Sequence, residues 1–270
     1  CNGFQVLTRL GLFGKDVTIV RKGPHYYIGK TVAIQNIDAY SQRDYDKPFR
    51  DARSGMLPPK LAQIMINLSR PAKGATIVDP FCGTGTILSE AMLMGFEAIG
   101  SDINEAMVKG AEHNCTWLKK FFKEESPPCE IFLKDATQLT HEDLKNKKDL
   151  AIVTESFLGP PQSKFPGEGE LKKIHDELTQ LHASFFTNLK KWLPKDTKIV
   201  VLFACHKDKS RFAFIHHLIE KIEQLGFKHE PILPDELKTK FNLKTSLRNT
   251  IVYEREDQIV GREVVRFTNH

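Results

Sequence analysis

The sequence predicts a doubly wound α/β fold, and three observations lead to that prediction. Apolar runs of strand type alternate with helical stretches along most of the chain. The glycine turn Gly83-Thr84-Gly85 joins the first of these strands to a helix, as in nucleotide-binding units. Acidic residues end four strands, at Asp79, Asp102, Asp135 and Glu155. Ligands bind at the carboxyl ends of the strands in such sheets, so these acids predict a single site.

The composition is that of an ordinary globular protein. The 270 residues are 40% hydrophobic and 27% charged, enough for one large domain with an appendage. A net charge of +5 permits nucleic-acid binding without requiring it. The five widely spaced cysteines lack metal-binding spacing, which favours reduced thiols, no metal and a cytoplasmic protein. Neither a signal peptide nor a run of about 18 apolar residues is present, so no membrane association is expected.

The first 40 residues are expected to form a short β-rich extension. Residues 17–20 and 26–28 are strand-like and flank the turn Lys22-Gly23-Pro24. Such a short segment buries little surface, and Cys1 suggests that the chain begins inside a longer protein. The expected domains are therefore 1–40, an extension or the remnant of a preceding domain, and 41–270, the main domain.

The polar segment 40–53 has two interpretations. It is either a solvated linker or a loop at the mouth of the site, with Arg43, Arg50 and Arg53 near substrate phosphates. Apolar residues then recur at helical spacing over 61–68, which predicts a helix that packs on the core. The other expected strands cover 77–79, 97–102, 130–136, 150–154, 198–205 and 250–253, and the other helices cover 87–94, 106–122, 171–193 and 212–225.

The glycine turn favours a methyl donor over a dinucleotide. Leu88 stands where the dinucleotide fingerprint has its third glycine. Asp79 fits poorly beside a pyrophosphate but suits an ammonium group. S-adenosylmethionine carries an ammonium and a sulfonium and no phosphate. Asp102 follows Gly85 at about the interval, roughly 20 residues, at which an acid holds ribose hydroxyls.

The stretch Asp79-Pro80-Phe81-Cys82-Gly83-Thr84-Gly85-Thr86 closely resembles the D-P-F-C-G-S/T-G-T motif of Rossmann-like class I methyltransferases that modify exocyclic amines of nucleic-acid bases. Over residues 35–265 the chain looks most like the tRNA guanine-N2 methyltransferases that carry an N-terminal THUMP domain. Three segments support this narrower resemblance, namely 43–62, Asn67-Leu68 and the tail 253–255 with 258–263. It implies a seven-stranded, mostly parallel sheet whose last strand is antiparallel, S-adenosylmethionine as cofactor, and cytoplasmic tRNA as the partner that is methylated.

The resemblance also implies roles for residues around the donor. Asp79 would face the amino group, and Asp102 would hold the ribose. The other residues expected at the cofactor are Phe81, Gly83, Thr84 and Gly85 in the turn, Ile103, Asp135 and Ala136 around the adenine, and Gly55, Met56 and Leu57 over the methionine end.

The fourth strand carries the expected catalytic residues. The family pattern D/N-P-P-Y/F is replaced here by Thr154-Glu155-Ser156-Phe157. Counting from the strand places Glu155 at the acid, whereas matching the aromatic residue places Thr154 there. Glu155 is favoured, because a carboxylate can accept from the attacking amine and take its proton. Phe157 is then the residue expected to stack on the flipped base. Ser156 in place of the first proline leaves open whether the site is fully active.

Three functions remain open from the sequence. The first is methyl transfer to the exocyclic amine of a base, guanine N2 in tRNA above all. The second is methylation of DNA adenine or protein glutamine, and the third is a catalytically impaired domain that binds S-adenosylmethionine or RNA. The THUMP module of the family is either missing from this chain or dispensed with. The nucleotide, the number of methyl groups and the oligomeric state are not determined.

Overall fold

The computed structural model describes residues 17–30, 32–51, 55–122, 127–208, 211–255 and 258–270. Arg53, one of the expected phosphate contacts, lies outside the described residues. The chain divides into two compact units, residues 1–42 and 43–270, and each is described here by itself.

The first unit contains an antiparallel hairpin. Strand β1 (Val17–Lys22) pairs with β2 (His25–Lys30) around a turn at Gly23, which has φ +60°. Every residue of β2 is exposed, so the hairpin buries no core of its own. A short helix α2 (Ile37–Ser41) follows and has no buried residues. The predicted β-rich extension is present, with its turn where the glycine allows a positive φ.

The second unit alternates strands and helices as predicted. Its strands are β3 (Thr76–Asp79), β4 (Glu97–Asp102), β5 (Cys129–Leu133), β6 (Leu150–Glu155), β7 (Lys198–Asp208), β8 (Arg211–Phe214), β9 (Phe227–Glu230), β10 (Ile251–Tyr253) and β11 (Val260–Asn269). Its α-helices are α3 (Pro59–Ser69), α4 (Thr86–Leu93), α5 (Glu105–Phe122), α6 (Glu168–Lys190), α7 (Leu218–Gln224) and α8 (Asp235–Phe241). A π-helical turn η1 (Gln42–Asp46) and a 3₁₀ turn η2 (Ala136–Gln138) complete the described elements.

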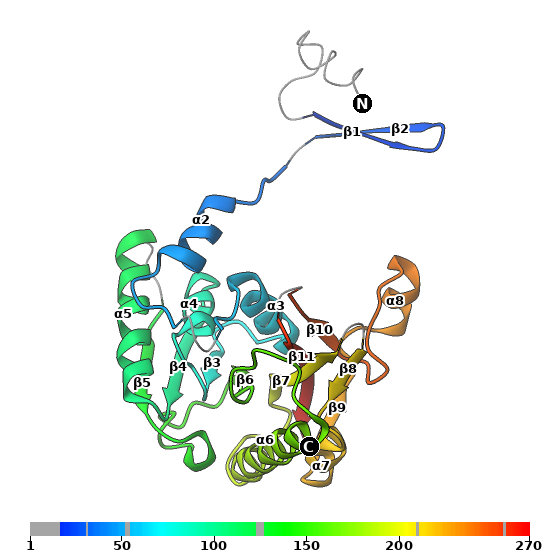
Figure 1. The fold of residues 1–270 in the computed structure, drawn as a ribbon. Coiled ribbons are helices and arrows are strands. Elements are labelled where there is room, and N and C mark those ends of the chain that lie inside the picture. The colour runs from blue at the N-terminus through cyan, green and yellow to red at the C-terminus, as the bar shows by residue number, and fades with distance from the viewer. Residues whose placement is uncertain (1–16, 31, 52–54, 123–126, 209–210, 256–257) are drawn as a thin grey trace. The chain divides into compact units, whose positions relative to one another are not determined.

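The strands form one sheet in the order β10-β11-β7-β6-β3-β4-β5 (Figure 1). Neighbours from β7 to β5 are parallel, and β11 is antiparallel to β7. The described part of the sheet has nine strands where seven were expected. The additional pairings depend on β7 and β11, which have 11 and 10 residues and extend far enough to pair with the short strands β8 and β9.

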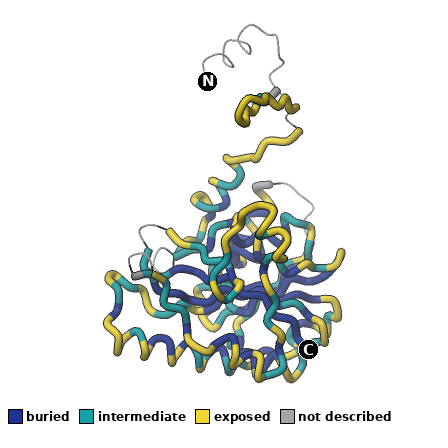
Figure 2. Tube along the Cα trace, turned by 90° about the vertical axis from the view of Figure 1, so that its right-hand side faces the viewer, coloured by how far each residue is buried: buried dark blue, intermediate teal, exposed yellow. Residues whose placement is uncertain are grey.

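Helices cover both faces of this sheet, and the strand pattern explains why. Successive side chains of a strand point to opposite faces, so a strand covered on both sides is apolar throughout. Ile199 and Val201 of β7 pack in one core cluster with α6 and α7, whereas Val200 and Leu202 pack in the other with α3, α4 and α5. Figure 2 shows the resulting buried strands inside an exposed outer layer.

Besides α2, β9 and α8, which were not predicted, two differences from the predicted secondary structure concern strands that pair with β7. Residues 212–214, expected to begin a helix, lie in β8, and α7 begins only at Leu218. The long strand β11 was not predicted, because Arg262, Glu263 and Arg266 make its sequence look exposed although all three are buried. In each case pairing with the long strand β7 or burial against neighbours decides the structure, not the local pattern.

The strand order creates a switch point between β3 and β6. From β3 the chain proceeds outward through β4 to β5, then returns to place β6 on the other side of β3. Ligands of open α/β sheets bind outside the carboxyl ends of the strands at such a point. Asp79 ends β3 and Glu155 ends β6, so the fold brings these two acids to opposite sides of one crevice.

Candidate functional site

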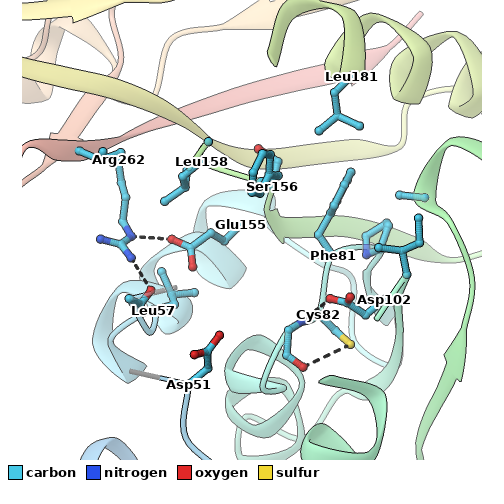
Figure 3. A pocket seen from close by; sticks show the side chains of 18 of the residues that line it. Asp51, Leu57, Phe81, Cys82, Asp102, Glu155, Ser156, Leu158, Leu181 and Arg262 are labelled. Carbon is cyan, nitrogen blue, oxygen red and sulfur yellow. Dashed lines mark hydrogen bonds and ion pairs between the residues drawn. The ribbon is translucent and has the colours of Figure 1, made fainter. Parts of the chain in front are cut away.

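A cavity of about 990 Å³ opens at this edge of the sheet (Figure 3). It is lined by the loops that follow β3, β4, β5 and β6, by residues 55–57 before α3, by 258–262 at the start of β11 and by part of α6. Segments distant in the sequence therefore meet at the crevice that the strand order predicts.

Asp79 is buried beneath the cavity. Its Oδ1 accepts hydrogen bonds from Thr154 Oγ1 at 2.6 Å and from the Phe81 N–H at 3.3 Å. Burial raises the pKa of this carboxyl to about 8, although both hydrogen bonds oppose the rise. The group is therefore largely neutral at pH 7 and is suited to ionise when a cation is placed against it.

Asp102 connects the glycine turn to the loop after β4. Its Oδ2 accepts from the Gly83 N–H and its Oδ1 from the Asn104 N–H, both at 2.9 Å. These bonds fix the carboxylate at the cavity wall while each oxygen keeps a lone pair for a ligand hydroxyl. Beside it, Ile103 is 72% exposed and presents an apolar face to the cavity.

The remaining expected cofactor residues also line the cavity, with one exception. Asp135 caps η2, its Oδ1 accepting from the N–H and the hydroxyl of Thr137 at 2.8 Å each. The cavity wall further includes Phe81, Gly83, Thr84, Ala136, Gly55, Met56 and Leu57. Gly85 is the exception, because it is not among the lining residues.

Gly85 makes room for a helix. It precedes α4 with φ +78°, and a Cβ added there would lie 3.0 Å from the Cβ of Ala111 on α5. Glycine is needed at this position for backbone conformation and for the close approach of α5.

Gly85→Ala should lower the free energy of unfolding by about 1–3 kcal/mol, because alanine is strained at positive φ and must also displace α5. Gly95→Ala is the matched control, since Gly95 also has positive φ but an added Cβ would meet nothing within 4 Å. Denaturant unfolding of both variants measures the difference. Equal losses would show that the contact with Ala111 contributes nothing.

The structure distinguishes the two candidates for the acceptor position on β6. Thr154 is fully buried, bonds Asp79 and does not line the cavity. Glu155 does line it, and its Oε1 accepts from Arg262 Nε at 2.5 Å. Phe157 lines the same wall and is 55% exposed, available for stacking. Burial raises the pKa of Glu155, and the guanidinium of Arg262 opposes the rise.

Ser156 occupies the position where the resemblance expects a proline. Its Oγ donates to the carbonyl of Leu202 on β7 at 2.7 Å, and the side chain is buried. The hydroxyl thus ties the loop after β6 to the neighbouring strand. The departure from the family pattern is accommodated by a hydrogen bond that proline could not make.

The polar segment before α3 supports the glycine turn, and one of its three arginines is buried there. Arg43 is buried, and its Nε donates to Glu90 Oε1 on α4 at 2.7 Å. Arg43 therefore does not lie where a phosphate could reach it. Lys47 donates to Thr86 Oγ1 at 3.0 Å, close to the turn. Arg50 is exposed, with its guanidinium 5.8 Å from the ring centre of Tyr45.

Asn114 attaches the same segment to the turn. Its side-chain oxygen accepts from the Phe49 N–H at 2.9 Å, and its amide nitrogen donates to the carbonyls of Phe49 and Thr84. These bonds link α5, the segment after η1 and the glycine turn. Together with the bonds of Lys47 to Thr84 and Thr86, they hold the glycine turn, which forms part of the cavity wall.

Three charged residues of the cavity, Asp51, Glu177 on α6 and Arg262, were given no role by the sequence reasoning. Asp51 lines it at the end of the polar segment, and Arg262 lines it from β11 (Figure 3). Asp51 looked like one more charge in a solvated stretch. Arg262 belongs to a segment that carried the family resemblance, but only the antiparallel pairing of β11 with β7 brings it beside Glu155.

A family of known proteins matches part of the chain. Residues 48–156 match the family UPF0020, described as RMKL-like, methyltransferase domain. This part of the chain is therefore similar to the methyltransferase domain of that family. The match covers the glycine turn and extends to Ser156, so both acids at the switch point lie inside the matched residues.

Archaeal proteins resemble the methyltransferase domain and its surroundings. The tRNA (guanine(10)-N2)-dimethyltransferase of Methanocaldococcus jannaschii is 30% identical over 199 residues, which are 69% of this chain and 54% of that protein. The protein of the same name from Methanothermobacter thermautotrophicus is 41% identical over 104 residues, 37% of this chain and 30% of that protein. The chain thus spans about half the length of these curated relatives or less.

Solved structures confirm the predicted Rossmann-like fold. TrmN from Thermus thermophilus matches with a TM-score of 0.50 at 16% identity, over 99% of this chain and 65% of that one. NSun6 from Pyrococcus horikoshii matches with a TM-score of 0.51 at 11% identity, over 77% of this chain and 51% of that one.

Two kinds of feature are absent from the described residues. Across this part of the chain, no helix is long and apolar enough to cross a membrane. The same residues contain no group of three or more His, Cys, Asp or Glu side chains that could hold a metal ion.

Proposed function

We propose that this chain is an S-adenosylmethionine-dependent N-methyltransferase that modifies the exocyclic N2 amine of guanine in tRNA. One observation carries the proposal. On the β3 and β4 side, the cavity at the switch point has residues suited to the methyl donor, and at the end of β6 it has an ion-paired carboxylate, Glu155. The names of the archaeal relatives support the substrate, and tRNA would place the reaction in the cytoplasm.

The residues of the cavity suit the proposed cofactor. The buried carboxyl of Asp79 suits an ammonium group, and Asp102 at the next strand end suits two ribose hydroxyls. The apolar face of Ile103 and the free oxygen of Asp135 suit an adenine ring and its amino group. When bound, S-adenosylmethionine supplies a methyl group on a positively charged sulfur.

Glu155 would orient the attacking amine. Its carboxylate would accept a hydrogen bond from an N–H of the target, which directs the nitrogen lone pair toward the methyl carbon. It would take the proton of that nitrogen as the methyl group passes from the sulfur to the nitrogen. Phe157 would stack on the flipped base. Ser156 keeps this loop attached to β7, so the substituted position does not argue against catalysis.

A carboxylate at this position favours guanine over the alternatives. The Watson–Crick edge of guanine presents two neighbouring donors, N1–H and N2–H, and a carboxylate offers two acceptors. Adenine presents a donor beside an acceptor, and so does the amide of glutamine. A carboxylate leaves those acceptors without a donor, so DNA adenine and protein glutamine fit Glu155 less well.

The proposal is tested by transfer of labelled methyl from S-adenosylmethionine to bulk tRNA, followed by digestion to nucleosides. Label in N2-methylguanosine or N2,N2-dimethylguanosine is the expected result. Label in N6-methyl-2′-deoxyadenosine with a DNA substrate, or in N-methylglutamine with a protein substrate, would support those alternatives instead. Donor binding without any transfer would identify a catalytically impaired domain.

Asp102→Ala should weaken binding of S-adenosylmethionine about 10- to 100-fold, because the ribose loses charge-assisted hydrogen bonds. Asp143→Ala is a matched control, since Asp143 also accepts a backbone N–H but does not line the cavity. Calorimetric titration measures both affinities. Unchanged donor affinity in Asp102→Ala would contradict the assigned orientation of the cofactor.

A further inference from the structure

Arg262 lies where the two halves of the proposed site meet. It sits in β11 opposite Ala204 of β7 and is only 3% exposed. Its guanidinium nevertheless reaches the cavity (Figure 3). Burying an arginine is energetically acceptable when its N–H groups are paired with hydrogen-bond acceptors.

The guanidinium bonds two segments that are distant in the sequence and one residue close to it. Nε donates to Glu155 Oε1 at the end of β6, and Nη2 donates to the carbonyl of Gly55 at 2.9 Å. Nη1 contacts Gln258 Oε1 at 3.4 Å. Since the guanidinium is planar and rigid, fixing one of these partners also fixes the direction of the others.

Arg262 supplies the positive charge of the described cavity wall. Among the described lining residues, Arg262 is the only one with a positively charged side chain, against several carboxyls. Burial disfavours the ionised form of Glu155 and raises its pKa, while Arg262 opposes this effect. An accepting carboxylate must be ionised, so its function depends on this partner.

We propose that Arg262 is a positioning residue that aims Glu155 through Nε and holds the Gly55 turn through Nη2, so that one side chain aligns the acceptor and donor halves of the site. This inference rests on the proposed function, in which Glu155 accepts from the target amine and the turn at 55–57 covers the donor. In this proposal Arg262 acts through its two partners, Glu155 and Gly55.

The two contacts can be separated by substitution. Arg262→Lys keeps a positive charge near Glu155 but cannot reproduce the rigid fork that also reaches Gly55. Arg262→Gln removes the charge as well. Glu155→Gln removes the carboxylate while leaving Arg262 able to hold the Gly55 carbonyl, and so serves as the matched variant for the donor half.

Three measurements on the 270-residue chain test the inference. Titration with S-adenosylmethionine should show affinity about 10-fold weaker in both Arg262 variants and unchanged in Glu155→Gln. NMR titration of carboxyl-labelled glutamate, with Glu155→Gln assigning the signal, should move the midpoint of Glu155 up by about one pH unit or more in Arg262→Gln and little in Arg262→Lys. The pH midpoint on the acid side of the kcat profile should likewise rise most in Arg262→Gln and little in Arg262→Lys.

A structural role alone would lower stability without moving these quantities. Thermal unfolding is therefore recorded first, and if Arg262→Gln does not fold, Arg262→Lys and Glu155→Gln carry the test through donor affinity. Donor binding in Arg262→Lys equal to wild type, or a Glu155 midpoint unmoved in a folded Arg262→Gln, would overturn the inference. A wild-type chain that binds donor but transfers no methyl would instead overturn the proposed function, and the NMR and binding measurements would still decide the role of Arg262.

Discussion

Glu155→Gln is expected to lower methyl transfer to tRNA about 100- to 1,000-fold, because the amide cannot take the proton of the attacking amine. Donor affinity should stay within about threefold of wild type, since Glu155 lies at the end of β6, outside the proposed donor wall of β3 and β4, and the bond from Arg262 to Gly55 is retained. Single-turnover transfer of labelled methyl and calorimetric donor titration provide the two measurements.

Glu263→Gln is the matched control for this effect. Glu263 is also a buried, paired glutamate, accepting from Thr250 Oγ1 at 2.7 Å beside Arg248, but it does not line the cavity. Its transfer rate should remain within about threefold of wild type when compared at a temperature where both variants are folded. Transfer by Glu155→Gln at the rate of Glu263→Gln would remove Glu155 from the mechanism.

Donor binding is expected to release roughly 0.8 proton at pH 7, because Asp79 is mostly protonated when free and ionised when paired with an ammonium. Whether protons are released or taken up depends on the pKa values of two groups. Burial raises the pKa of Asp79 to about 8, and an α-amino group titrates at about 7.7–8.0. At pH 7 the carboxyl gives up its proton, whereas at pH 9 the amine must gain one, so release should change to uptake near pH 8.

Titration calorimetry in two buffers of different ionisation enthalpy measures this proton exchange. Asp79→Asn should abolish the release at pH 7 and weaken donor binding about 10- to 100-fold. Thr154→Val should keep the carboxyl but shift the change of sign to higher pH, because the Thr154 hydroxyl favours the ionised form. Identical binding heats in both buffers at pH 7 would contradict the role of Asp79.

The β3 and β4 side of the cavity could be predicted from the sequence because its residues lie close together in the chain. Asp79, Gly83 and Thr84 form a continuous strand and turn, and Asp102 and Asp135 follow at the ends of the next two strands. Their chemistry depends on local geometry that a βα unit repeats in many proteins. Gly85 is an exception, because it was expected at the cofactor but does not line the cavity. Its close approach to Ala111 depends on how α5 packs, which the local sequence does not show.

The sequence by itself determined the alternation of strands and helices, the acids at the strand ends and the donor turn, because each follows from periodicity or from neighbouring residues. Tertiary structure decided the rest. The choice of Glu155 over Thr154 depends on which side chain of β6 faces the cavity. The burial of Arg43 and the meeting of Arg262 with Glu155 depend on pairings across 47 and 107 residues. Such contacts leave no local pattern, since long-range packing and strand register create them.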